Sequence, residues 1–159
     1  EFYYTPGHTV DSCSCFDHAD RVLFVGDNVE LPIPYVNELN FASYVATLEE
    51  YLERNAEFIV SGHADVADDY ALLRINLDYV KSLGTLSVDN SSLDKKGKIM
   101  HFRNLTNIGA KLREKNLIKE ALQHYRESER VLEKMDDNVQ GKWEQLKQVR
   151  EIITSLTER

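Results

Sequence analysis

The strongest constraint on the fold is an abrupt change in hydrophobic periodicity along this chain of 159 residues. Short apolar or alternating segments, which are typical of β-strands, occur only before residue 62. Four such strands are expected, at residues 2–4, 12–17, 21–25 and 58–61. Beyond residue 98 every periodic segment has helical spacing. The sequence therefore predicts an α/β unit followed by an all-α unit.

Helical spacing also predicts two helices in the first unit. One spans residues 40–54, with Asn40 as its N-cap, and the other spans residues 68–83, with Asp68 and Asp69 in its first turn. We expect the unit to occupy residues 1–85, followed by a polar linker over 86–98 and a helical appendage over 99–159. The appendage should form a helical hairpin plus a third helix, which carries Trp143 and caps the hairpin.

Charge is distributed unevenly between these parts. The net charge is −8, with −12 over residues 1–90 and +4 over residues 91–159. The acidic part argues against a nucleic-acid partner and is compatible with a cation site, because phosphate binding needs clustered cations. Charges of both signs alternate along the later helices, which is typical of solvated faces. The sequence has no apolar run near the roughly 18 residues of a membrane span, so no membrane partner is expected.

The two cysteines, Cys13 and Cys15, lie two positions apart on one expected strand and so point to the same face. They are poorly placed to bond each other, which favours a reducing compartment such as the cytoplasm. They act either as small buried hydrophobic residues or as metal or redox groups.

Three loops that follow expected strands carry the residues able to do chemistry. His8 lies in the loop Thr5-Pro6-Gly7-His8-Thr9, Asp27 follows Gly26, and His63 follows Gly62. Strand ends at one sheet edge are where ligands gather in α/β folds. Two imidazoles and a carboxylate suit Zn, Fe or Mn, and Thr9 and Asp65 are candidate hydrogen-bond partners for a ligating imidazole.

Each residue also has an ordinary explanation. A histidine after a glycine is usually a loop residue, and Asp27 is equally suited to capping a turn. The prediction of a metal site rests on the joint occurrence of all three loops, in order, at strand ends.

Together these segments resemble the C-terminal half of the metallo-β-lactamase-fold hydrolases. The resemblance lies in Thr5–Ser12, Leu23–Asp27 and Ile59–His63, and covers about residues 1–85. It implies that His8 and His63 ligate metal and that Asp27 bridges two metals as the catalytic carboxylate. It also implies a divalent metal cofactor, zinc foremost, and a bridging water or hydroxide that attacks a carbonyl or phosphoryl centre of a small-molecule substrate.

The resemblance is incomplete in one respect. The family's first motif, His-x-His-x-Asp-His, is expected upstream of His8, and the sequence has no such motif. The other histidines are His18, in an expected turn, and His101 and His124, on expected helices; all three are interpreted as surface or packing residues. We therefore expect a fragment of a longer protein, able to hold at most one metal and inactive or nearly so by itself.

The family's αβ/βα sandwich has two similar halves, so one half would leave a sheet face uncovered. We expect either the missing N-terminal half or a second copy of the chain to cover it. Gly109, Asn116, Ala121, Tyr125 and Ser128 in the appendage are similar in spacing to one tetratricopeptide repeat.

Two functions fit these patterns. The first is part of a hydrolase acting on an ester, thioester, amide or phosphodiester. The second is a non-catalytic interaction or dimerisation module, in which a degenerate half-domain is joined to a helical repeat.

Overall fold

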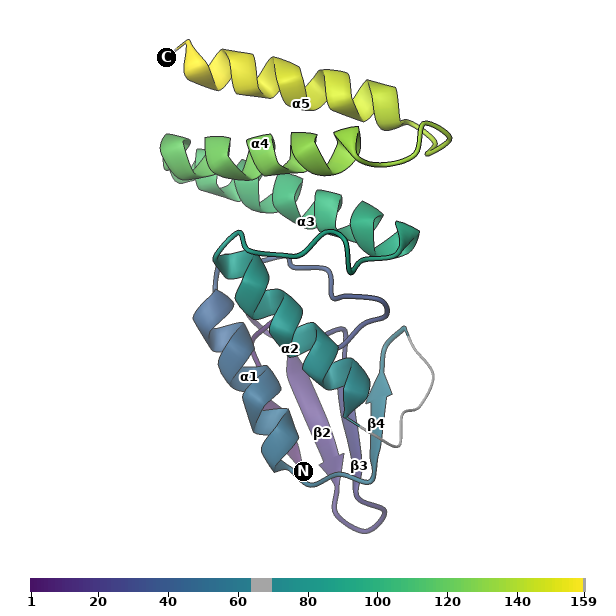
Figure 1. Cartoon of the computed structure of the whole chain (residues 1–159). Helices are drawn as coiled ribbons and strands as arrows, with labels where there is room; N and C mark the ends of the chain where they lie inside the picture. The colour runs from purple at the N-terminus through teal and green to yellow at the C-terminus, as the bar shows by residue number, and fades with distance from the viewer. Residues whose placement is uncertain (64–69, 159) are drawn as a thin grey trace. The chain divides into compact units, whose positions relative to one another are not determined.

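The computed structural model describes residues 1–63 and 70–158 and divides into two compact units, Glu1–Val88 and Asp89–Arg159. The first unit contains a sheet of four strands with two helices on one of its sides (Figure 1). Its elements are β1 (Phe2–Tyr4), β2 (Cys13–Asp17), β3 (Val22–Gly26), α1 (Phe41–Glu53), β4 (Phe58–Ser61) and α2 (Ala71–Gly84). The mixed α/β class and the positions of the four strands are confirmed.

The strands lie in the order β1-β2-β3-β4. The first three are antiparallel neighbours, whereas β4 runs parallel to β3. A parallel pair needs a crossover, and α1 supplies it. Because β1, β3 and β4 all run in the same direction, the loops that follow them emerge at one edge of the sheet.

The two sides of this sheet differ sharply. Alternate residues of β2 and β3 point toward the helices and are buried with apolar residues of α1 and α2. The members of this core include Phe16, Leu23, Val25, Tyr44, Leu48, Tyr51, Leu73 and Val80. On the other side Phe2 is 83% exposed, Tyr4 63% and Phe24 44%. The core is thus one-sided, and an apolar sheet face remains open.

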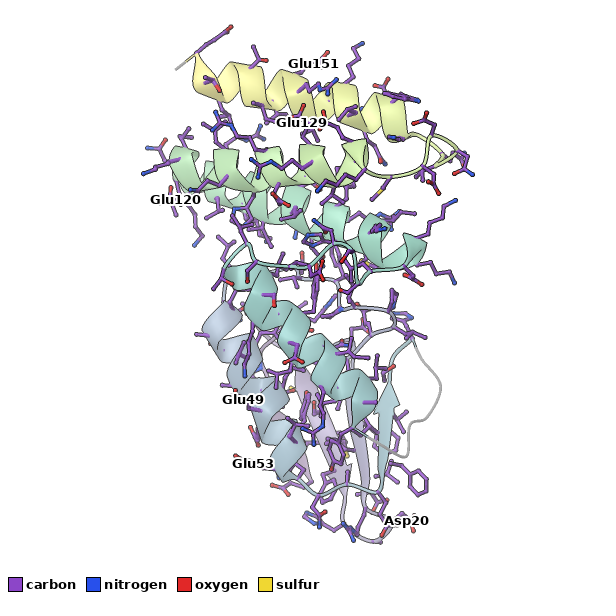
Figure 2. The ribbon with its side chains drawn as sticks, viewed as in Figure 1. Asp20, Glu49, Glu53, Glu120, Glu129 and Glu151 are labelled. Carbon is purple, nitrogen blue, oxygen red and sulfur yellow. The ribbon has the colours of Figure 1, made fainter. Side chains whose placement is uncertain are left out.

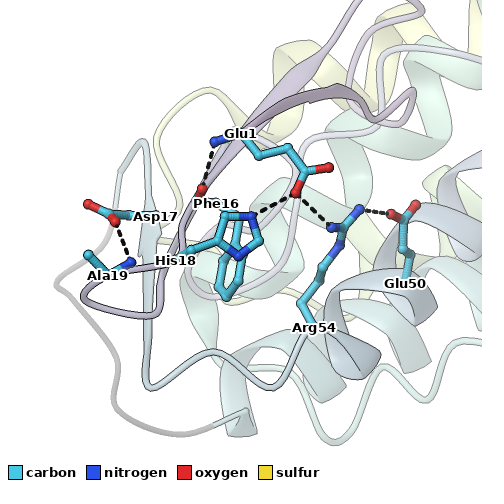
Figure 3. A network of polar contacts seen from close by, with 7 residues as sticks. All are labelled: Glu1, Phe16, Asp17, His18, Ala19, Glu50 and Arg54. Carbon is cyan, nitrogen blue, oxygen red and sulfur yellow. Dashed lines mark hydrogen bonds and ion pairs between the residues drawn. The ribbon is translucent and has the colours of Figure 1, made fainter.

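A polar network ties the start of the chain to α1 at the opposite edge of the sheet (Figure 3). The Glu1 amine donates to the Phe16 carbonyl at 2.9 Å, and the Glu1 carboxylate lies 2.9 Å from His18 Nε2. Arg54 reaches both Glu1 and Glu50. The His18 side chain is 66% exposed, in agreement with its interpretation as a surface residue.

The second unit consists of α3 (Lys95–Glu114), α4 (Ile118–Glu133) and α5 (Lys142–Thr157). The side chain of Asp94 caps α3 by accepting from the Gly97 amide at 2.7 Å. The last four residues of the predicted linker are therefore helical, and that part of the prediction was wrong. Asn116, at a positive φ of 59°, lies in the turn before α4.

Close packing joins α3 to α4 at Gly109. A Cβ atom on this glycine would lie 3.1 Å from the ring of Tyr125, so the helices cross where no side chain intervenes. Arg150 of α5 pairs with Glu129 and Glu133 of α4, each at 2.6 Å. Trp143, which this third helix carries, is 61% exposed, because the inward face of α5 is formed by Leu146, Val149 and Leu156.

Among the helices that the structure describes, none combines the length and the apolar character that crossing a membrane needs.

Candidate metal centre

Three side chains at the edge where β3 and β4 end can reach a common point. They are Asp27, Glu30 and His63, and one ligand atom from each lies within 4.8 Å of the other two. His63 Nε2 is 3.4 Å from Asp27 Oδ1. Asp27 and His63 are partly exposed at the surface, whereas Glu30 is 9% exposed. The structure thus brings together two of the three predicted ligands, Asp27 and His63, and places a further metal-capable side chain, Glu30, beside them.

The ends of β3 and β4 fix the position of Asp27. The Gly62 amide donates to the Gly26 carbonyl at 2.9 Å, which continues the pairing with β3 one residue beyond the end of β4. A Cβ atom on residue 62 would collide with Asp27 Oδ1. With glycine at position 62, this backbone approaches the carboxylate closely without displacing it.

Asn28, the residue after Asp27, holds the loop that carries His8 against the loop that carries Asp27. Its side-chain oxygen accepts from the His8 amide at 2.8 Å, and its side-chain nitrogen donates to the Thr5 carbonyl and the Tyr51 hydroxyl, both at 2.8 Å. Burial raises the pKa of the Tyr51 phenol, so this hydroxyl stays protonated at neutral pH. Asn28 is 1% exposed. One buried amide thus fixes the positions of the loops that carry His8 and Asp27.

His8 lies outside the cluster of Asp27, Glu30 and His63. Its Nδ1 lies 2.8 Å from the Tyr35 carbonyl, a bond that fixes the ring and leaves Nε2 for another partner. A backbone carbonyl is a common partner for the second nitrogen of a metal-ligating histidine. The arrangement of His8 is therefore compatible with ligation, but not to the same point as the other three.

The predicted hydrogen-bond partners of the imidazoles are placed differently. The Thr9 hydroxyl bonds the Ser12 hydroxyl at 2.9 Å, while Tyr35 takes the position next to the His8 ring. Asp65, as well as Asp68 and Asp69, lies outside the described residues.

Glu30 is the residue that the sequence analysis missed. Its Oε2 accepts from the Tyr35 amide at 2.6 Å, so the segment Leu31–Tyr35 folds back over it. The available signal was a glutamate three residues after Asp27 and directly before the proline-rich segment Leu31–Tyr35.

The donor set fits a divalent transition metal. Imidazole nitrogen and carboxylate oxygen bind zinc, manganese and iron at about 2.0–2.2 Å, so two ligands of one ion are at most about 4.4 Å apart. Atoms within 4.8 Å of one another reach that arrangement by small side-chain rotations. The two carboxylates also offset the charge of the ion.

Comparisons with known proteins agree with this location. The family model described as "Metallo-beta-lactamase superfamily" matches residues 1–63, a range that ends on His63. No curated protein matches the chain.

Several solved structures are similar over about half of the chain. A metallo-beta-lactamase from Pontibacter korlensis has 23% identity and a TM-score of 0.44 over 51% of this chain and 40% of its own. The metallo-beta-lactamase DIM-1, in a structure exposed to ceftazidime, has 24% identity and a TM-score of 0.45 over the same shares. The chain spans about two fifths of the length of these structures. The segment with His8, Asp27, Glu30 and His63 is thus the part that matches the metallo-β-lactamase superfamily.

Proposed function

We propose that this chain forms part of a metal-dependent hydrolase that acts on an ester, thioester, amide or phosphodiester. The single observation that carries the proposal is the convergence of Asp27, Glu30 and His63 within the segment that matches the family. A bound divalent ion would supply Lewis-acid chemistry, both by activating water and by polarising a carbonyl or phosphoryl oxygen.

The roles of the protein groups follow from their positions. Asp27 and His63 hold the ion at the open edge of the sheet, where a small-molecule substrate has access, because both side chains are partly exposed. His8 points its Nε2 away from the Tyr35 carbonyl and is available to a second ion. Zinc is the proposed metal, because it accepts mixed nitrogen and oxygen ligands.

The test uses the natural polypeptide that contains this chain, loaded with zinc and assayed against one substrate of each of the four classes. We expect metal-dependent turnover that Asp27→Asn or His63→Ala lowers by at least about a hundredfold. The control variant Glu53→Gln removes the same charge from the exposed surface of α1 (Figure 2). Turnover of no substrate class by the metal-loaded polypeptide would refute the proposal.

A partner for the open sheet face forms the second part of the proposal. The register places Phe2, Cys15, Phe24 and Val60 in one row across all four strands, with Phe58 beside Val22 in the next. Such a continuous apolar face is typical of an interface. We propose that the other αβ layer of a sandwich, supplied by residues outside this chain, covers it. Sedimentation of the isolated chain as a stable homodimer would favour a second copy instead.

An interaction module is the alternative function, and the second unit is the observation that favours it. The close contact of Gly109 with Tyr125 and the turn at Asn116 are typical of a tetratricopeptide-like hairpin, for which packing, dimerisation or shaping of a substrate cleft are the proposed roles. Absence of metal from the chain in excess zinc and manganese would favour this alternative. Both cysteines are free, which supports the cytoplasm as the proposed compartment.

A further inference from the structure

Glu30 differs from the other acidic residues near the sheet edge in being buried. It is 9% exposed, yet its carboxylate lies beside two metal-capable groups, Asp27 and His63. A buried carboxylate is costly unless it is hydrogen-bonded or paired with a cation. The Tyr35 amide satisfies Oε2, and a cation between the three side chains would compensate the remaining charge.

The backbone of Glu30 is held as firmly as its side chain. The side chain of Asn76, a fully buried residue of α2, accepts from the Glu30 amide at 2.9 Å and donates to the Glu30 carbonyl at 3.0 Å. Glu30 is therefore held at two places: Asn76 of α2 binds its backbone, and the Tyr35 amide binds one oxygen of its carboxylate. A ligand residue that is held in place before the ion binds loses little conformational freedom on binding, which favours a high affinity.

Tyr35 links this glutamate to His8. Its amide donates to Glu30 Oε2, while its carbonyl bonds His8 Nδ1. One residue of the proline-rich segment thus holds Glu30 in the cluster and keeps His8 turned toward the backbone.

We propose that Glu30 is a metal ligand, and that Asp27, Glu30 and His63 together hold one divalent cation within this chain. The inference rests on the metal site of the proposed function and adds a residue to it. Two carboxylates and one imidazole form a harder ligand set than histidines alone, so the site should accept Mn²⁺ as well as Zn²⁺.

The test measures Mn²⁺ binding to the chain by electron paramagnetic resonance, without any assay of activity. Glu30→Gln should raise the Kd for Mn²⁺ at least about tenfold, because glutamine removes the charge but keeps an oxygen for the Tyr35 amide. His8→Ala should change the Kd less than about twofold. Glu53→Gln, an equal loss of charge on the exposed surface of α1, should leave it unchanged.

The outcomes separate this inference from the proposed function. Equal Mn²⁺ affinity of Glu30→Gln and the wild-type chain would overturn the ligand role of Glu30 and leave Asp27 and His63 in place. Equal affinity of Asp27→Asn and the wild-type chain, or no binding by the wild-type chain, would overturn both this inference and the metal site on which it rests.

A second measurement needs no variant and covers the case in which Glu30→Gln fails to fold. X-ray absorption of the zinc-loaded wild-type chain counts the imidazole ligands. One imidazole per zinc supports the cluster of Asp27, Glu30 and His63, whereas two would assign His8 to the same ion and refute the inference.

Discussion

The two units of this chain differ in the polar contacts that join their elements. In the first unit, buried amides and hydroxyls join segments far apart in sequence, as Asn28 does for Thr5 and Tyr51 and as Asn76 does for Glu30. In the second unit, ion pairs such as that of Arg150 with Glu129 lie on the surface between helices. Long-range buried hydrogen bonds fix loops, whereas surface pairs add little. Among the described residues, the group of three metal-capable side chains lies in the first unit, where buried hydrogen bonds of this kind hold the loops.

The largest expected effect tests this contrast at Asn28. Replacement by alanine leaves the His8 amide and the Thr5 carbonyl without their partner in a buried place. We expect a loss of about 3–5 kcal/mol in the free energy of unfolding of the first unit. Hydrogen exchange read by mass spectrometry would localise the loss. Asn138→Ala, at an exposed position of the second unit, is the control; an equal effect there would contradict the contrast.

Acid should act on the second unit through His101. Burial lowers the pKa of this imidazole to about 4. In the unfolded chain this imidazole has a pKa near 6.5 and therefore binds a proton more readily than in the folded chain. The stability of the second unit is thus retained above pH 6.5 and is lost as the pH falls from 6.5 to 4. We expect a loss of about 2–3 kcal/mol at pH 4.5 relative to pH 7.

Urea unfolding at both pH values would measure this loss through the fluorescence of Trp143, the sole tryptophan and a residue of the second unit. A His101→Gln variant should lose most of the pH dependence of stability. A smaller pH dependence should remain, because burial also lowers the pKa of His124. The control His18→Gln, at an exposed position of the first unit, should retain it.

The helix contact at Gly109 should give a smaller effect, because it depends on packing alone. Gly109→Leu would place side-chain atoms against the Tyr125 ring, because even a Cβ atom at this position would lie only 3.1 Å from that ring. Overpacking, partly offset by better helix propensity, should cost the second unit about 1–2 kcal/mol. Adding Tyr125→Leu should recover part of that loss in a double-mutant cycle, and strictly additive losses would show that the two residues do not interact.

The smallest effect on stability is expected at Phe24, on the open face of the sheet. Because this ring is 44% exposed, Phe24→Thr should change the free energy of unfolding by less than about 1 kcal/mol. It should nevertheless reduce binding of a hydrophobic dye and self-association at high concentration. Leu23→Thr, one residue away but fully buried, should destabilise the unit strongly; similar melting temperatures for the two variants would contradict a one-sided core.

The strands could be predicted because each is a short apolar or alternating segment, and the observed bounds differ from the expected ones by at most one residue. The start of α3 and the exposure of Trp143 could not be predicted. The start of α3 depends on the cap formed by Asp94, and the exposure of Trp143 depends on which side of α5 meets its neighbour.

The candidate site could be predicted only in part. His8, Asp27 and His63 each follow a strand, and the direction of the strands brings their loops to one edge. Which ligand atoms converge depends on how the segment after Asp27 folds back. The Tyr35 amide donates to a glutamate 5 positions away, and Asn76 binds the backbone of the same glutamate from 46 positions away. No local sequence pattern predicts either contact.

The contact between Gly62 and Asp27 has a consequence for reading related sequences. Any side chain at position 62 would displace the Asp27 carboxylate, so a chain can keep every ligand and still lose the geometry. A substitution of Gly62 would therefore move a group of the proposed metal site without removing any of its ligand residues. Position 62 is thus one to compare between related sequences, although its own side chain binds nothing.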